Sequence, residues 1–208
     1  MIDFNNKELY PIFCLTSFKL VKYSRDLNFY HTIHHIHDML KLASKDIEYI
    51  KTITDVDCFI TAIAYHDIVY RTNRQDNEMA SAKIFETTFN WIRNEFDKNF
   101  SDEKRQLIFD LILSTQFGYD IKTEAEKLLH DYDYMNFSDK SKMEFSDKQI
   151  LNECLRDDCF NFNLIISKRM EFYKLLYDNA IKSGRFFLTD KYSYLNELAI
   201  KNIKEYII

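Results

Sequence analysis

The chain has 208 residues, and its 33 Asp and Glu residues outnumber its 28 Lys and Arg residues, which gives a net charge of −5 at pH 7 with neutral histidine. This charge provides no general attraction to nucleic acid or to an anionic membrane, although a local basic pocket can still bind a small phosphate. No apolar stretch approaches the ~18 residues that a membrane-spanning helix requires. We therefore expect neither a membrane nor bulk nucleic acid as a partner.

Turn-forming residues are scarce, because the chain has only two glycines and one proline. Average usage is about 7% for glycine and 5% for proline, so the composition favours an all-α fold. The length suits one helical domain over residues 1–208. The four cysteines show no C-x-x-C spacing, and the first residues lack the features of a signal peptide. We expect reduced thiols and a cytoplasmic location.

In the first half of the chain, apolar residues recur every three or four positions, which predicts helices. One helix is predicted after Thr54, with Asp57 as its capping-box partner and an end near His66. Residues 69–76 are predicted to form a loop. A helix is also predicted after Asp76, with an apolar stripe of Phe85, Phe89, Ile92 and Phe96. Another is predicted after Ser101, with an apolar stripe of Leu107, Ile108, Leu111 and Ile112.

The second half begins with a polar stretch, residues 137–147, which is the best loop candidate. A long helical segment is predicted to begin about Ser146, with Gln149 in the capping-box position, and to stop at Gly184. A last helix is predicted with Asp190 as its N-cap. Its inward stripe is Leu195, Leu198, Ala199, Asn202, Ile203, Tyr206 and Ile207.

Histidine and aspartate gather in three separate segments. Four of the six histidines lie within residues 31–37, and the other two begin the sequences His66-Asp67 and His130-Asp131-Tyr132-Asp133. Imidazole nitrogen and carboxylate oxygen are ligands that zinc, manganese, iron and nickel accept. A single helical histidine is more often a core or surface residue, so the combination of segments is what predicts a metal site.

Helical geometry narrows the candidate ligands. On one helix His31 and His35 would share a face, so both imidazoles could meet one ion. Asp131 and Asp133 would diverge by about 200° around a helix, and only one is expected to face the ion. The residue pattern alone does not choose between these two aspartates.

The order His35, His66-Asp67, Asp133 resembles the H…HD…D order of the HD superfamily of metal-dependent phosphohydrolases. The chain resembles, more closely, a family of small, predicted metal-dependent HD-superfamily phosphohydrolases, and the resemblance extends from about Tyr23 to Glu205. The motifs Tyr-His-x-x-x-His-Ile, His-Asp-x-x-Tyr, Asn-Glu-x-x-Ser-Ala and Asp-x-Asp match residues 30–36, 66–70, 77–82 and 131–133, and Gly184-Arg185 and residues 197–202 also fit.

This resemblance implies an HD-domain helical bundle in which His35, His66, Asp67 and Asp133 bind one divalent metal ion (Mn, Mg, Co, Ni, Fe or Zn). Metal-activated water would attack phosphorus. His31 and Glu78 are candidate catalytic groups that orient water or protonate the leaving group, although Glu78 equally suits a helix-capping role. Arg169 and Arg185 are candidate phosphate-binding residues, with helix-surface ion pairs as the alternative.

Three positions depart from the family's pattern. Asn28 replaces an arginine, with Arg25 one turn earlier, Gly118 replaces a histidine, and Tyr134 replaces a leucine. If the missing histidine assists a second metal or the substrate, catalysis would be weak, altered or absent.

Three functions follow from these observations. The favoured one is hydrolysis of a small phosphorylated molecule, with a nucleotide among the candidates. The second is a binding module that keeps the fold without catalysis, which Asn28 and Gly118 make plausible. The least favoured is a di-iron oxygenase, for which His31 and His34 would provide further ligands.

Overall fold

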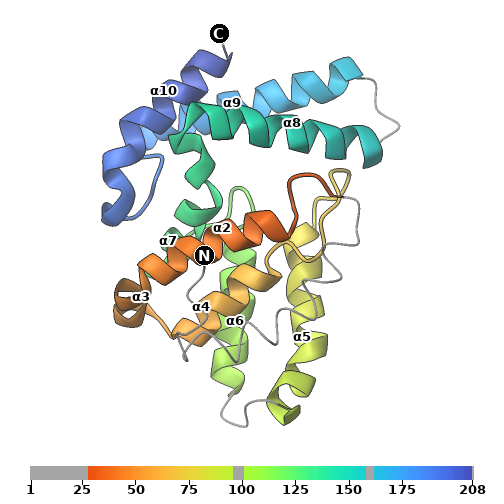
Figure 1. Cartoon of the computed structure of the whole chain (residues 1–208), viewed down its shortest axis with the longest axis vertical. Coiled ribbons are helices and arrows are strands. Elements are labelled where there is room, and N and C mark those ends of the chain that lie inside the picture. Colours follow the sequence, from red (N-terminus) through yellow and green to blue (C-terminus); the bar gives the residue numbers. More distant parts are fainter. Residues whose placement is uncertain (1–27, 96–100, 158–161, 208) are drawn as a thin grey trace.

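The computed structural model describes residues 28–95, 101–157 and 162–207, and within these ranges the chain forms helices and no strands (Figure 1). The α-helices are α2 (Ile33–Lys45), α3 (Ile47–Ile53), α4 (Val56–Tyr65), α5 (Asn77–Glu95), α6 (Asp102–Ser114), α7 (Glu124–Asp133), α8 (Lys140–Asp157), α9 (Phe162–Ser183) and α10 (Asn196–Ile207). The 3₁₀ helices are η1 (Met135–Ser138) and η2 (Asp190–Leu195). The all-α prediction is confirmed, and the single-domain assignment stays a prediction.

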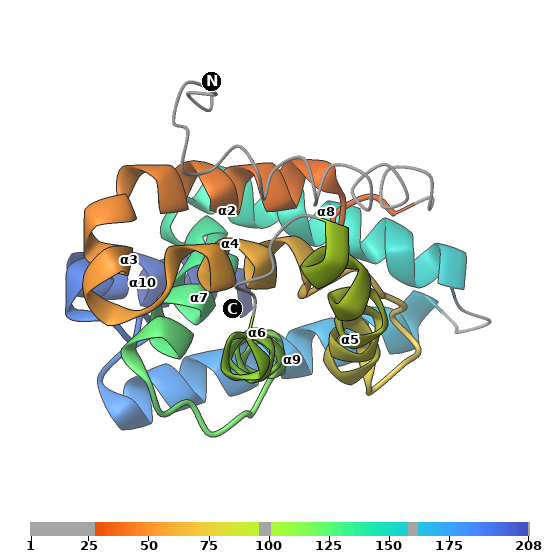
Figure 2. The same cartoon turned by 90° about the horizontal axis from the view of Figure 1, so that it is seen from below.

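The helices form two groups along the long axis of the molecule. Helices α2 to α7 make up the lower group in Figure 1, and α8, α9 and α10 lie together above them. Seen from below, α6 is close to end-on with α5 beside it (Figure 2). The 3₁₀ helix η1 follows α7 and packs on both α8 and α10, so it joins the two groups. None of the helices in the described ranges is long and apolar enough to cross a membrane.

Helix α4 is the centre of the lower group. All its side chains from Cys58 to Tyr65 are buried, and it packs against α2, α3, α5, α6 and α7. Phe59 meets Tyr132 of α7 edge-to-face, with ring centroids 5.8 Å apart. Burial of one such side chain contributes roughly 1.5–3 kcal/mol, so packing fixes the position of α4 and the residues at its C-terminus.

The N-terminal helix boundaries largely follow the sequence prediction. Ser101 caps α6 as predicted, by accepting the N–H of Lys104. Helix α4 begins within two residues of the predicted start, but its cap is Asp55, which accepts the Cys58 N–H, so the predicted box of Thr54 and Asp57 is wrong. The loop over residues 69–76 is confirmed. Phe85 and Phe89 of the α5 stripe are buried, whereas Ile92 and Phe96 lie outside the described side chains.

The C-terminal half differs more from the prediction. Residues 137–147 are not a loop, because they include the end of η1 and the start of α8, where Asp139 accepts the N–H groups of Ser141 and Lys142. The predicted single helix is two helices, α8 and α9, which run antiparallel, and residues 158–161 lie outside the described part. Gly184 follows the end of α9 at φ +72°, as predicted.

The last helical region also has corrected boundaries. Thr189, rather than Asp190, is the cap, and the residues after it form η2 before α10 begins at Asn196. Cys58 and Cys154 form no disulfide within the described residues, as expected, whereas Cys14 and Cys159 lie outside them.

Candidate metal centre

Four side chains from the lower group of helices converge on one point. His35 comes from α2, His66 is the C-cap of α4 and Asp67 follows it, and Asp133 is the last residue of α7. One ligand atom from each residue lies within 4.8 Å of the others. His35 Nε2 lies 3.0 Å from Asp133 Oδ1, and His66 Nε2 lies 3.0 Å from Asp67 Oδ2. We call these four residues the His/Asp cluster.

Each of the two imidazoles in the His/Asp cluster contributes one ring nitrogen, Nε2, that makes no hydrogen bond within the described structure. His66 Nδ1 lies 2.8 Å from the carbonyl oxygen of Ile63, which can only accept, so in the neutral ring Nδ1 carries the proton and Nε2 offers its lone pair. The Nε2 atoms of His35 and His66 are buried and, within the described structure, make no hydrogen bond. Two such nitrogens beside two carboxylates fit a shared divalent cation, which would satisfy all four groups.

The local electrostatics favour a positive charge. Helices α4 and α7 both end at the cluster, and the C-terminus of a helix carries partial negative charge. Burial lowers the pKa of His66, but the neighbouring carboxylates of Asp67 and Asp133 outweigh burial and raise it to about 9. Burial raises the pKa of Asp67, but the nearby imidazoles, His66 first, hold it well below its usual range. Without a metal, the cluster therefore retains a proton near neutral pH.

The structure distinguishes the two aspartates of the Asp-x-Asp motif. Asp131 is fully buried and accepts the N–H of Leu188 and both the N–H and the hydroxyl of Thr189. Asp133 instead faces His35 in the cluster. Asp131 therefore anchors the chain before η2, and the carboxylate available to a metal is that of Asp133.

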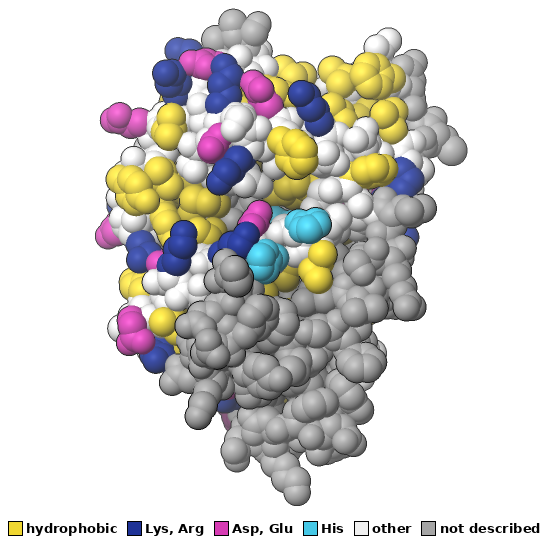
Figure 3. Space-filling model, in the orientation of Figure 1, with side chains coloured by type: hydrophobic (Ala, Val, Ile, Leu, Met, Phe, Trp, Pro, Cys, Tyr) yellow, Lys and Arg dark blue, Asp and Glu magenta, His cyan; other side chains and the backbone are white. Residues whose placement is uncertain are grey.

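The expected pairing of His31 with His35 on one helix face is wrong. Thr32 caps α2, so His31 precedes the helix. Its Nδ1 lies 2.6 Å from Glu153 Oε2, and its ring stacks on Tyr70 with centroids 3.3 Å apart. His34 is exposed, and Figure 3 shows histidine side chains at the surface on this side of the molecule. The described structure thus places only His35, of the histidines in residues 31–37, in the cluster.

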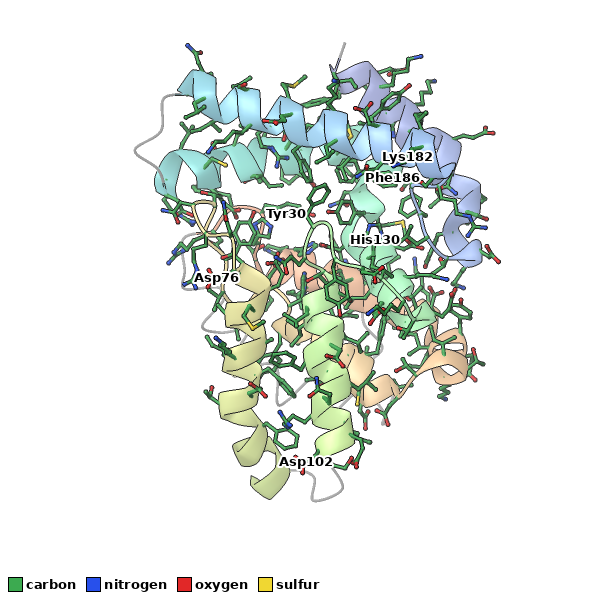
Figure 4. The ribbon with its side chains drawn as sticks, turned by 180° about the vertical axis from the view of Figure 1, so that it is seen from behind. Tyr30, Asp76, Asp102, His130, Lys182 and Phe186 are labelled. Atoms are coloured by element: carbon green, nitrogen blue, oxygen red, sulfur yellow. The ribbon has the colours of Figure 1, made fainter. Side chains whose placement is uncertain are left out.

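A cavity of about 370 Å³ adjoins the cluster, which presents Asp67 and Asp133 to it. His31 and Glu78 also line this cavity, which we call the site cavity. Seven aromatic residues also line it, namely Tyr30, Tyr70, Phe117, Tyr134, Phe137, Phe172 and Tyr173. Figure 4 shows Tyr30 between the two groups of helices. The volume lies within the range of about 300–1,000 Å³ that is usual for small-molecule sites.

Glu78 reaches the site cavity because the loop over residues 69–76 folds back on α5. The Asn77 amide accepts the N–H of Arg71 and donates to its carbonyl, and the Ser81 hydroxyl bonds both backbone groups of Val69. Burial and the charges of the cluster aspartates raise the pKa of Glu78 above its usual value. The Asn-Glu-x-x-Ser motif therefore provides two loop anchors and one carboxyl group in the cavity.

The two candidate phosphate-binding arginines lie in different places. Arg169 of α9 lines the site cavity with Lys168, and its guanidinium is held by Asp147 and by the Tyr173 hydroxyl. Arg185 pairs with the exposed Asp190 at 2.9 Å and lines a neighbouring cavity with residues that include His130 and Lys182. Only Arg169 shares a cavity with the cluster.

The departures from the family pattern have visible structural roles. Asn28 donates to the His31 carbonyl and accepts from Arg156 Nη1 at 2.6 Å, so it ties the segment before α2 to α8. Gly118 adopts φ +83° and lines the neighbouring cavity, and its sequence neighbour Phe117 lines both cavities. Tyr134 stacks on His130 and also lines both cavities.

Two site residues were not found from the sequence. Glu153 is a fully buried acid of α8 that contacts His31, and Lys168 lines the site cavity from α9. No motif marks either residue, because each depends on how the α8–α9 pair covers the lower helices. Comparison of the chain with models of protein families, with curated proteins and with solved structures found no match.

Proposed function

We propose that this protein is a metal-dependent phosphohydrolase of the HD type that acts on a small phosphorylated molecule. The observation that carries the proposal is the convergence of His35, His66, Asp67 and Asp133, with two unshared buried Nε2 atoms, beside a cavity lined by cationic side chains. The H…HD…D order along the sequence supports the HD assignment.

The donor set suits a borderline divalent cation, because it combines two imidazole nitrogens with two carboxylate oxygens. Such an ion, when bound, supplies Lewis acidity and lowers the pKa of coordinated water. Among the residues of the chain, Lys168 and Arg169 would orient the phosphate, with Arg169 fixed by its contact with Asp147. His31 and Glu78 would exchange protons with water or with the leaving group.

The site cavity limits the substrate class. Its volume of about 370 Å³ accommodates a small molecule rather than a nucleic-acid duplex. The aromatic wall can stack a planar group, so a nucleotide is the first compound class to screen. A single group of candidate ligands in the described structure supports one metal ion per chain.

The proposal is tested by measuring bound metal together with phosphate release. Wild-type protein, Asp67→Asn and Asp38→Asn would each be loaded with Mn²⁺, Co²⁺, Mg²⁺, Ni²⁺, Fe²⁺ or Zn²⁺ and assayed against a panel of phosphorylated metabolites. Asp38 is the matched control, because its side chain is 70% exposed and it lies on α2 outside the cluster. We expect one ion per chain and phosphate release in wild type and control, and the loss of both in Asp67→Asn.

Circular dichroism and cooperative unfolding must first show that Asp67→Asn is folded, since metal binding also stabilises the native state. A wild-type protein that takes up no divalent ion would contradict the proposal. A protein that binds one ion and a nucleotide but releases no phosphate from any substrate would be a binding module instead.

A further inference from the structure

Glu153 uses both oxygens of its buried carboxylate on one short segment. Oε1 accepts the backbone N–H groups of Phe29, Tyr30 and His31 at 2.7–2.9 Å. Oε2 lies 2.6 Å from His31 Nδ1. Burial raises the pKa of Glu153, but its bonds with His31 and with these N–H groups outweigh burial and lower it. The carboxylate is therefore ionised. Among the described residues, His31 alone forms a hydrogen bond with Oε2.

The His31 ring is held on its other sides as well. It stacks on Tyr70 at an interplanar angle of 16° and meets Tyr30 edge-on at 85°. Because an ionised carboxylate can only accept, Nδ1 of His31 must carry a proton. The remaining ring nitrogen, Nε2, is then the one available to a molecule in the site cavity, which His31 lines together with the cluster aspartates.

We propose that Glu153 is a positioning residue that fixes the tautomer and the plane of His31, so that His31 protonates the leaving group through Nε2. The catalytic part of this inference rests on the proposed phosphohydrolase function. In the step, the oxygen of water forms a bond to phosphorus and the bond to the leaving oxygen breaks. Here His31 reacts in its charged form, with a proton on each ring nitrogen. The leaving oxygen keeps the electron pair and takes the Nε2 proton, which leaves His31 as the neutral tautomer with Nδ1–H hydrogen-bonded to Glu153. The proton of the attacking water passes to the carboxylate of Glu78, which lines the same cavity.

If Glu153 served only to anchor residues 29–31, this would explain the hydrogen bonds of its Oε1 but not the contact of its Oε2 with His31. Glu153→Gln separates the two roles. The amide oxygen can still accept the three backbone N–H groups, whereas the amide NH₂ would face His31 Nδ1 and donate to it. In this variant the neutral His31 ring would carry its proton on Nε2, and residues 29–31 would keep their hydrogen bonds to residue 153.

The first measurement is heteronuclear NMR of the histidine ring nitrogens in the full chain, with and without Zn²⁺. In wild type we expect His31 with Nδ1 protonated, and in Glu153→Gln we expect the neutral tautomer with the proton on Nε2. Glu144→Gln makes the same change on α8 outside the site cavity and should match wild type. A wild-type His31 that is neutral with its proton on Nε2 would overturn the inference.

The second measurement compares substrates that differ in the acidity of their leaving group. His31→Gln and Glu153→Gln should lose about 100-fold or more in kcat on alkyl phosphates, whose leaving group needs a proton. Both variants should lose far less on 4-nitrophenyl phosphate, whose leaving group departs as an anion. Equal losses on both substrates would show that the pair does not serve proton transfer.

These outcomes separate the inference from the proposed function. Metal-loaded wild type without phosphate release would refute the proposed function and the proton-transfer role together, whereas the NMR result would still decide whether Glu153 fixes the His31 tautomer. A normal phosphatase with an unchanged His31 tautomer in Glu153→Gln would refute this inference alone.

Discussion

At the scale of single residues, the two aspartates of the Asp-x-Asp motif perform different tasks although they are two positions apart. Asp131 accepts three hydrogen bonds from Leu188 and Thr189, and Asp133 belongs to the His/Asp cluster. The spacing of the two residues predicts that only one of them faces a metal, and the family resemblance alone indicates Asp133. That choice depends on the side of α7 against which residues 188–189 pack, and no local pattern encodes it.

We expect Asp131→Asn to lower mainly the stability of the protein and Asp133→Asn to lower mainly its affinity for a metal. Asp131→Asn should destabilise the protein by about 2–4 kcal/mol, because buried hydrogen bonds to a charged group contribute about 1.5–3 kcal/mol each. Asp133→Asn should change stability less but lower metal affinity at least about 100-fold, since even outer-shell changes cost about 10–100-fold. Denaturant unfolding and metal titration of both variants check this. Strong metal binding by Asp133→Asn would contradict the assigned ligand set.

The raised pKa of His66 predicts how metal affinity depends on pH. The pKa is about 9 in the folded protein against 6.5 for an unperturbed histidine. This group therefore stabilises the metal-free protein fully below pH 6.5, and that stabilisation is lost as pH rises through about 9. A metal must displace the same proton, so its apparent affinity should rise from pH 6.5 to about 9 and then level off.

Metal titrations across this pH range in a weakly chelating buffer would measure the effect, with proton release followed by calorimetry in buffers of different ionisation enthalpy. His34→Gln, which changes an exposed histidine outside the cluster, should retain the full pH dependence. An affinity that stays constant over the interval would show that His66 gives up no proton to the metal.

At the scale of elements, helices with apolar stripes could be predicted and helices with polar contacts could not. Helix α6 begins and packs as its sequence indicates, with Ile108, Leu111 and Ile112 buried. The start of α8 was missed because two of its buried positions are polar. Ser146 bonds Asn136, and Asp147 bonds Arg169 of α9. Such positions become visible only once their partners in other elements are known.

The loop over residues 69–76 depends on Asn77 for its shape. Asn77→Ala should cost about 1–3 kcal/mol, because the N–H and carbonyl of Arg71 both lose their partner. Hydrogen exchange at the Arg71 amide should accelerate, and activity should fall as Glu78 leaves the site cavity. Asn73→Ala, in the same loop but exposed, is the control. Equal exchange rates in both variants would show that Asn77 does not hold the loop.

At the scale of the whole molecule, the site combines two groups of helices with separate roles. The candidate metal ligands lie on α2 and α7 or directly after α4, all in the lower group. The cationic wall of the site cavity comes from α9 in the upper group. The sequence could predict the first part, since its residues form motifs, whereas the second depends on the packing of α8 and α9 over the lower helices.

This division predicts stepwise protection from hydrogen exchange. A divalent metal alone should protect the residues around His35, the end of α4 and the end of α7, with a stabilisation of about 2.7 kcal/mol at 100 times the dissociation constant. Metal together with inorganic phosphate should in addition protect the part of α9 around Arg169, because the anion would bridge the cluster and the cationic wall.

The variants Arg169→Gln and Lys182→Gln test this second step. Lys182 lines the neighbouring cavity rather than the site cavity, so its substitution should leave both steps of protection unchanged. Arg169→Gln should retain the metal step and lose the phosphate step, since its half-buried guanidinium is held in the cavity wall by Asp147. If phosphate instead protects the neighbouring cavity in a manner that depends on Lys182, the anion binds there, and the substrate does not span the two groups of helices at the cluster.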